Sequence, residues 1–283
     1  MNTLLNIGQG YVADALSARL MARGWAVRGT ARDLPAPRTR ADGVRLYPWP
    51  MDATAALDGA THLLLSAPPE AAGDPVLAAA GAAIAARADR IAWIGYLSTT
   101  GVWGDHGGAW VDEATPPDPG TERGRRRLQA ERDWAALAAR SGLKLHILRL
   151  PGIYGPGRSA LDRVRAGSAR RIVKPGHLTN RMHVEDIAAT LTASIGRPRP
   201  GAVYALADDE PAPPQDVIAF AAALLGIDPP PEQPFATAGL SGMAAGFYAE
   251  AKRVRNARIK AELAVRLTYP TYREGLQALA ARG

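Results

Sequence analysis

Short apolar runs alternate with longer amphipathic stretches through the first half of the chain. Short apolar runs predict buried strands, whereas apolar residues that recur every three or four positions predict helices. The expected strands are residues 4–7, 25–30, 44–47, 61–66, 91–97 and 145–150, and the expected helices are residues 11–23, 74–88 and 121–141. Strands that alternate with helices in this way form a parallel sheet with helices on its faces, so we expect an α/β protein.

The pattern changes after Pro151, where prolines and glycines become frequent and the expected elements become shorter. Helices are expected at residues 184–195, 215–225, 258–263 and 272–281, and a strand is expected at residues 203–206. Three consecutive prolines at residues 229–231 indicate a linker or a turn. We therefore divide the chain into a core of residues 1–155 and a smaller C-terminal lobe, mainly residues 156–283, from which about residues 183–206 return to the core.

The junction between the first strand and the first helix carries chemistry of its own. Residues 8–13 read G-x-G-x-x-A. In this motif the first glycine permits a tight turn, the second lets the backbone approach a pyrophosphate, and the alanine lets the helix pack closely on the strand. The start of the helix then offers unpaired N–H groups to the phosphates. The motif predicts a dinucleotide on a Rossmann-type, doubly wound parallel sheet, bound by Gly8, Gln9, Gly10, Tyr11 and Val12.

The end of the second strand indicates which dinucleotide is bound. Enzymes that use NAD place an acidic residue there for the ribose hydroxyls, whereas enzymes that use NADP tend to have a nearby arginine for the 2′-phosphate. This chain has no acid at the strand end, where Thr30 offers a hydroxyl and Arg32 follows, and Asp33 comes one residue late and suits a turn. Because a planar guanidinium binds two phosphate oxygens at once, we predict NADP(H) in preference to NAD.

Three further segments resemble the extended or atypical short-chain dehydrogenase/reductase family, the NAD-dependent epimerase/dehydratase group. Residues 97–104 (LSTTGVWG) resemble the family's serine-rich strand end followed by V-Y-G, with Trp103 in place of the tyrosine. Residues 148–157 (LRLPGIYGPG) resemble its L-R-x-x-x-x-Y-G-P-G segment, and residues 183–187 (HVEDI) resemble its H-V-D-D segment. The resemblance implies the family's Rossmann core with a small C-terminal substrate lobe.

The resemblance also implies roles for residues beyond the glycine turn. Thr99 matches the hydroxyl residue that polarises the reacting carbonyl or hydroxyl group of the substrate. Two loops match the segments that pass the cofactor's ribose and its nicotinamide, and their residues are Ser66, Ala67, Pro68, Pro151 and Ile153.

The family's catalytic pair is replaced in this chain. The family uses Y-x-x-x-K on a helix, where the spacing of four places both side chains on one face. The matching stretch, residues 123–131, has Arg123 in place of the tyrosine and Arg127 in place of the lysine. Arginine stays protonated throughout the useful pH range, so Arg123 is a poor general base. Both arginines are expected to bind anionic groups of the substrate or cofactor, and the proton would come from water or from an unidentified residue.

Composition narrows the classes of partner. The 283-residue chain has no cysteine, which excludes disulfides and cysteine-ligated metals, and its apolar stretches are too short to span a membrane. The net charge is +7, and the basic residues are spread along the chain. The one cluster of arginines, at residues 123–127, has no aromatic residues between them. Neither nucleic acid nor a membrane is therefore expected as a partner. Residues 183–186 do not have a standard metal-ligand spacing, so no metal is expected. We expect a cytoplasmic protein with a small-molecule substrate, and a homodimer is left open.

Two classes of function fit these residues. An enzyme would be an NADP(H)-dependent oxidoreductase or an epimerase-like enzyme for a polar substrate, such as a sugar or nucleotide-sugar derivative. In a variant of this reading, a tightly held NAD assists dehydration or epimerisation. The alternative is a catalytically degenerate sensor or interaction protein that binds NADP(H), and Arg123 in the tyrosine position favours it.

Overall fold

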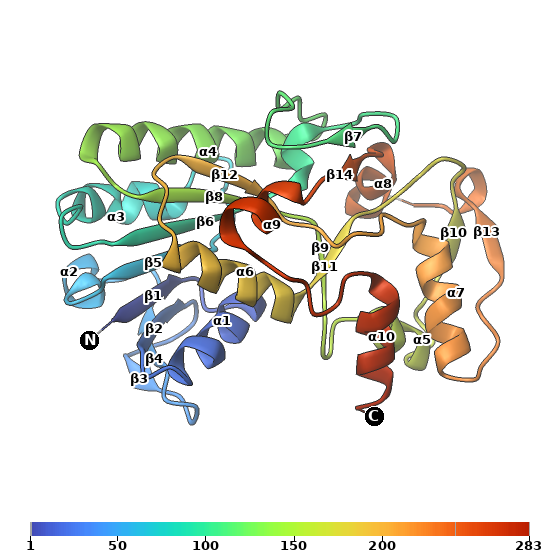
Figure 1. Cartoon of the computed structure of the whole chain (residues 1–283), viewed down its shortest axis with the longest axis horizontal. Helices are drawn as coiled ribbons and strands as arrows, with labels where there is room; N and C mark the ends of the chain where they lie inside the picture. The colour runs from blue at the N-terminus through green and yellow to red at the C-terminus, as the bar shows by residue number, and fades with distance from the viewer. Residues whose placement is uncertain (1, 241, 283) are drawn as a thin grey trace.

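A large, mainly parallel sheet forms the centre of the protein (Figure 1). The computed structural model describes residues 2–240 and 242–282, and within these residues eight strands join in one sheet. From one edge to the other they are β12 (Ala202–Ala205), β8 (Leu145–Leu150), β6 (Trp93–Thr99), β5 (His62–Leu65), β1 (Thr3–Ile7), β2 (Ala26–Ala31), β4 (Arg45–Pro48) and β3 (Arg38–Thr39). Neighbouring strands are parallel apart from β3, which pairs antiparallel with β4. The predicted Rossmann-type fold and each of its expected strands are confirmed.

The order of the strands determines where a ligand can bind. The chain builds the sheet outward from β1 in both directions, to β2 and β4 on one side and to β5, β6, β8 and β12 on the other. In sheets of this kind, ligands bind beyond the C-terminal ends of the strands, at the point where the winding direction reverses. Here that point lies between β1 and β5, next to the turn that follows β1.

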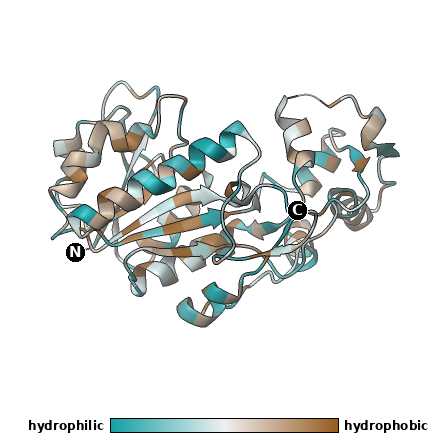
Figure 2. Cartoon of the chain, turned by 90° about the horizontal axis from the view of Figure 1, so that it is seen from above, coloured by the Kyte–Doolittle hydropathy of each residue, from teal (hydrophilic) through white to brown (hydrophobic). Residues whose placement is uncertain are grey.

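Helices cover both faces of the sheet. One face carries α1 (Tyr11–Met21), α6 (Val184–Gly196) and α9 (Ala257–Leu263), and the other carries α2 (Ala53–Leu57), α3 (Pro75–Ala85) and α4 (Glu122–Ser141). Successive strand residues point to opposite faces, so Leu4 packs in the first layer and Leu5 in the second. Seen from above, α4 lies across the sheet with hydrophilic residues concentrated at the end that begins at Glu122 (Figure 2).

The small C-terminal lobe lies beside the C-terminal ends of the strands (Figure 1). Its apolar core is formed by α5 (Ala160–Arg165), α7 (Pro214–Leu224) and α10 (Tyr272–Ala280). Two short ribbons, β10 (Arg171–Val173) with β13 (Glu232–Pro234) and β14 (Arg253–Val254) with β7 (Trp110–Val111), flank it together with α8 (Gly242–Ala249). A third ribbon, β9 (Gly152–Tyr154) with β11 (Arg181–His183), connects the sheet to the lobe.

The predicted helices end within about three residues of the observed ones. Gly24, three residues after the end of α1, has a φ of +77°, in the left-handed region that glycine adopts readily. The helices α2 and α5 and the two-residue strands were not predicted, because they are too short for a periodic pattern. The eight-residue α8 was also not predicted.

Candidate functional site

The glycine turn brings together the ends of three strands. Gly8 has a φ of +99°, and its N–H donates to Thr30 Oγ1 over 2.9 Å, while Gln9 N–H donates to the Thr30 carbonyl over 2.8 Å. On the other side, Ser66 Oγ donates to the Gly8 carbonyl, and a Cβ on Gly8 would stand 2.9 Å from that hydroxyl oxygen. The turn after β1 is therefore fixed by β2 and β5, and position 8 accepts only glycine.

The second glycine of the turn faces open space. No heavy atom of the described residues lies within 4 Å of the place where a Cβ of Gly10 would stand. Gly10 is the N-cap of α1 and provides no side-chain cap, so the first N–H groups of α1 have no partner within the helix. An anion approaching this space meets unpaired N–H groups and the positive end of the helix dipole. The turn thus fits the pyrophosphate of a dinucleotide.

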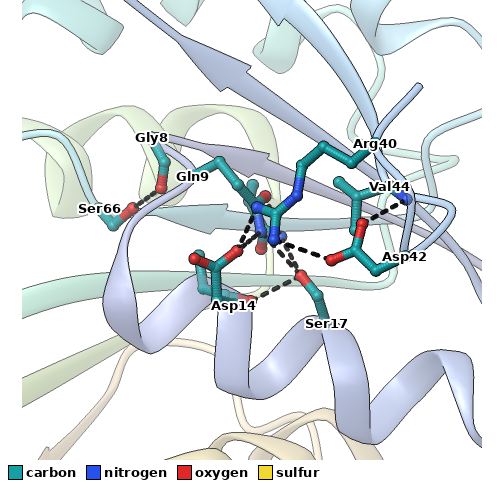
Figure 3. A network of polar contacts seen from close by, with 10 residues as sticks. Gly8, Gln9, Asp14, Ser17, Arg40, Asp42, Val44 and Ser66 are labelled. Atoms are coloured by element: carbon teal, nitrogen blue, oxygen red, sulfur yellow. Dashed lines mark hydrogen bonds and ion pairs between the residues drawn. The ribbon is translucent and has the colours of Figure 1, made fainter. Parts of the chain in front are cut away.

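Gln9 supports the turn from behind with its side chain (Figure 3). Its carbonyl oxygen accepts from Asn6 Nδ2 over 2.9 Å, and its amide nitrogen donates to Asp14 Oδ1 and Ser17 Oγ over 2.9 and 3.0 Å. A Cβ on Gly29 would stand 2.2 Å from the Gln9 carbonyl oxygen. Only the backbone of Gln9 is therefore left to face a ligand, and the sequence motif did not reveal that Asn6 and Gly29 are needed to hold it.

Arg32 extends into solvent directly after β2. It is exposed and makes no hydrogen bond or ion pair with any residue that the structure describes. Asp33, at a φ of +57°, lies in the turn that the sequence indicated. Arg38, on β3, is also exposed, whereas Arg40 contacts Asp14 over 2.6 Å (Figure 3). The antiparallel strand β3 thus brings a second exposed guanidinium to this edge, which the sequence analysis missed.

The loops after β5 and β8 run along the same end of the sheet. Ala67 is half-buried and Pro68 is exposed just beyond Ser66. Pro151 lies between β8 and β9, and Ile153 is half-buried on β9, whose partner β11 begins next to Asn180. These residues therefore lie at the same end of the sheet as the glycine turn, and their contacts with ribose and nicotinamide stay a prediction.

Thr99 ends β6 and begins the 3-10 turn η1 (Thr100–Trp103). Its Oγ1 accepts a hydrogen bond from Gly101 N–H over 3.2 Å, which leaves the hydroxyl proton available to a ligand. The first turn of α4 packs against η1, because a Cβ on Gly124 would stand only 2.8 Å from the Gly101 carbonyl. The structure thus places the first turn of α4 beside the turn that follows Thr99.

The two arginines of the replaced pair have different surroundings. Arg127 is buried, and its Nη1 donates to the Leu97 carbonyl over 2.8 Å and to the Tyr96 hydroxyl over 3.2 Å. Burial raises the pKa of Tyr96, although the neighbouring Arg127 opposes this shift. Arg123, in the first turn of α4, is exposed. The guanidinium of Arg127 therefore holds the end of β6, while Arg123 is placed at the surface.

A buried ion pair links α4 to the two strands beside it. Glu131 accepts from Arg149 over 2.8 and 3.1 Å and from Ser98 Oγ over 2.5 Å. The Arg149 guanidinium also lies over the Trp103 ring, 4.8 Å from its centre. Ser98, Glu131 and Arg149 are each at most 5% exposed, so the pair is removed from water. The sequence analysis did not identify this pair; its only signal in the sequence is the arginine inside the apolar run 145–150.

His183 is the N-cap of α6, in agreement with the helix predicted at residues 184–195. Its Nδ1 accepts from Glu185 N–H over 3.2 Å, and burial lowers its pKa.

Among the described residues, no three histidine, aspartate or glutamate side chains gather in a way that could hold a metal ion. Every helix within residues 2–240 and 242–282 is too short or too polar to cross a membrane.

Curated proteins resemble the chain in sequence. Protein YeeZ of Escherichia coli K12 is 32% identical over 246 residues, which cover 81% of this chain and 86% of that protein. A 3-diazoavenalumate denitrifying reductase of a Streptomyces species is 30% identical over 182 residues, which cover 59% of this chain and 58% of that protein. No protein-family model matches the chain.

Solved structures extend the comparison. A conserved protein of unknown function from Silicibacter pomeroyi is 53% identical, with a TM-score of 0.92 over 100% of this chain and 99% of that one. A Methylobacillus flagellatus protein described as an NAD-dependent epimerase/dehydratase is 27% identical, with a TM-score of 0.68 over 99% and 98% of the chains. UDP-glucuronic acid 4-epimerase of Bacillus cereus, in complex with NAD, shares the fold at 15% identity, with a TM-score of 0.78 over 99% and 96%. The chain belongs to the family of protein YeeZ, and its fold is that of the NAD-dependent epimerase/dehydratase-like proteins, the extended short-chain dehydrogenase/reductases.

Proposed function

We propose that the protein is an NADP(H)-dependent oxidoreductase or epimerase-like enzyme that acts on a polar substrate, with a sugar or nucleotide sugar as the leading candidate. The open space above Gly10, at the uncapped start of α1, is the observation that carries the proposal. Two comparisons support it, since the Bacillus cereus epimerase binds NAD and the Streptomyces relative is a reductase. When bound, the nicotinamide supplies hydride exchange.

NADP(H) is proposed over NAD because of the residues after β2. Arg32 is exposed and without a partner among the described residues, so its planar guanidinium is available for a 2′-phosphate. Thr30 binds Gly8 N–H through its hydroxyl, and this contact gives it a structural role beside the ribose site. An acid that would favour NAD is absent from β2 itself.

Within this proposal the residues near η1 act on the substrate. The Thr99 hydroxyl donates a hydrogen bond to the reacting oxygen, while its Oγ1 accepts from Gly101 N–H. Arg127 acts through Tyr96 and Leu97 and holds the strand that carries Thr99, so we assign it a positioning role. Arg123 is exposed at the start of α4 and binds an anionic group of the substrate.

Filling the space above Gly10 tests the binding site. We expect Gly10→Val to weaken NADPH binding more than tenfold, because its side chain would occupy the place of a phosphate. Gly196, at the end of α6, also faces open space, and Gly196→Val is the matched control that keeps wild-type affinity. Fluorescence titration with NADPH measures both. Equal affinities in the two variants, or the absence of saturable binding to the wild-type protein, contradict the proposal.

A non-enzymatic sensor is the second candidate, and the exposed arginine at position 123 favours it. Both candidates require NADP(H) binding, so only turnover separates them. The disappearance of NADPH absorbance is followed with a panel of carbonyl compounds and sugar nucleotides. Tight NADPH binding without turnover of any member of the panel supports the sensor.

A further inference from the structure

A second tight turn contacts the glycine turn from the side of the lobe. Gly155 N–H donates to the Arg158 carbonyl over 3.3 Å, and Arg158 N–H donates back to the Gly155 carbonyl over 3.0 Å. The Tyr11 hydroxyl donates to the Pro156 carbonyl over 3.0 Å, and a Cβ on Gly155 would stand 2.5 Å from that hydroxyl. The turn of residues 155–158 is therefore held against the first residue of α1.

This turn places a guanidinium beside the start of α1. The guanidinium carbon of Arg158 lies 5.7 Å from the centre of the Tyr11 ring, a distance at which the ring attracts a cation. The side chain of Arg158 is exposed and forms no hydrogen bond or ion pair with the residues that the structure describes. The nearby carboxylate of Asp162 is engaged by Ser159, over 2.6 and 2.7 Å.

The charges around Arg158 suit an anion. The N-terminus of a helix carries a partial positive charge, which disfavours a cation close to it. Arg158 nevertheless lies over the ring of Tyr11, the residue that directly follows Gly10. An anion between the guanidinium and the N–H groups of α1 would remove this repulsion and gain charge-assisted hydrogen bonds from both.

We propose that Arg158 binds the pyrophosphate of the dinucleotide from the side of the lobe, opposite the N–H groups of α1. This inference rests on the proposed function, because it assumes that the glycine turn binds a dinucleotide. Arg158 directly precedes Ser159, the N-cap of α5. The bound cofactor is therefore connected both to the sheet, through α1, and to the first helix of the lobe, through Arg158.

Paired titrations of four proteins test this assignment. The affinities of the wild-type protein and of Arg158→Ala, Arg158→Lys and Arg165→Ala are measured for NADPH and NADH, at low and at high salt. Arg165 is an exposed arginine on α5 and controls for net charge. We expect Arg158→Ala to lose about tenfold in affinity for both nucleotides equally, because both carry the pyrophosphate. Arg158→Lys should recover part of the loss, and the salt dependence of binding should be smaller in Arg158→Ala.

Each outcome bears on one of the two proposals. Wild-type affinity in Arg158→Ala, an equal loss in Arg165→Ala, or a loss for NADPH alone overturns the role of Arg158. If the wild-type protein binds neither nucleotide, the proposed function fails and this inference fails with it. Melting temperatures without nucleotide show whether the variants are folded, and we expect Arg158→Ala to match the wild-type protein because the side chain is exposed.

Discussion

The two ends of the proposed site are built on different principles. At the glycine turn, backbone groups of β1 and α1 face open space, and side chains such as Gln9 support them from behind. In the first half of α4, the charged side chains Arg127 and Glu131 are turned inward and bound to β6 and β8. The first end is arranged to receive a ligand. The second end uses its charged side chains to hold two strands. Charged residues there stabilise the fold and do not face a ligand.

The largest effect on the free energy of unfolding is expected when the buried ion pair between Glu131 and Arg149 is broken. Glu131→Gln leaves the guanidinium of Arg149 without its charged partner in the protein interior, which costs about 3–5 kcal/mol of the free energy of unfolding. Glu122→Gln, on the exposed first turn of α4, removes only surface ion pairs and should leave that free energy nearly unchanged. Urea denaturation measures both. A small effect of Glu131→Gln would show that the pair is dispensable.

The second expected effect is a loss of stability in acid, from a histidine on the same strand as Arg149. Arg199 N–H donates to His146 Nε2 over 2.7 Å, which fixes this nitrogen as unprotonated, and burial lowers the pKa of His146 to about 4. The unfolded chain takes up this proton at higher pH, so stability present above about pH 6.5 is lost as the pH falls to about 4, by on the order of 3 kcal/mol.

His146→Gln checks this origin. The variant should show a shallower fall in the free energy of unfolding between pH 6.5 and pH 4 than the wild-type protein, because it lacks one of the protons taken up on unfolding. Parallel pH profiles for the two proteins would rule out His146 as a contributor.

Arg127→Met tests whether Arg127 contributes to stability and not to cofactor binding. The variant loses the hydrogen bonds to Tyr96 and Leu97 and should lose about 2 kcal/mol of the free energy of unfolding. Its affinity for NADPH should remain close to that of the wild-type protein, because the guanidinium points inward. A large loss of affinity at unchanged stability would instead identify Arg127 as a cofactor ligand.

Arg32→Ala should show the opposite behaviour and the smallest free-energy change. We expect about a tenfold loss of affinity for NADPH, equivalent to about 1.4 kcal/mol, with affinity for NADH and the melting temperature unchanged, because the side chain is exposed and has no partner among the described residues. Paired titrations with the two nucleotides provide the measurement. An equal loss for both nucleotides, or none, would remove Arg32 from the 2′-phosphate site.

The sequence predicts the glycine-turn end better than the α4 end, and the reason is physical. The G-x-G-x-x-A motif acts through backbone geometry, so its role can be inferred from residue type and from its position between a strand and a helix. The partners of Arg127 and Glu131 come from strands distant in sequence, and neither composition nor periodicity indicates which way a long side chain turns. The contact between Tyr11 and Pro156 likewise depends on how the lobe folds back.

The amide of Gln9 limits how the nucleotide preference of this protein can be redesigned. Because it fills the space directly above Gly29, no acidic residue fits at that point of β2. Thr30 is already needed by the Gly8 N–H. A designer who wants an NAD-selective variant must therefore work beyond the strand, at the exposed position 32, where Arg32→Asp would exchange the charge without disturbing the packing of the turn.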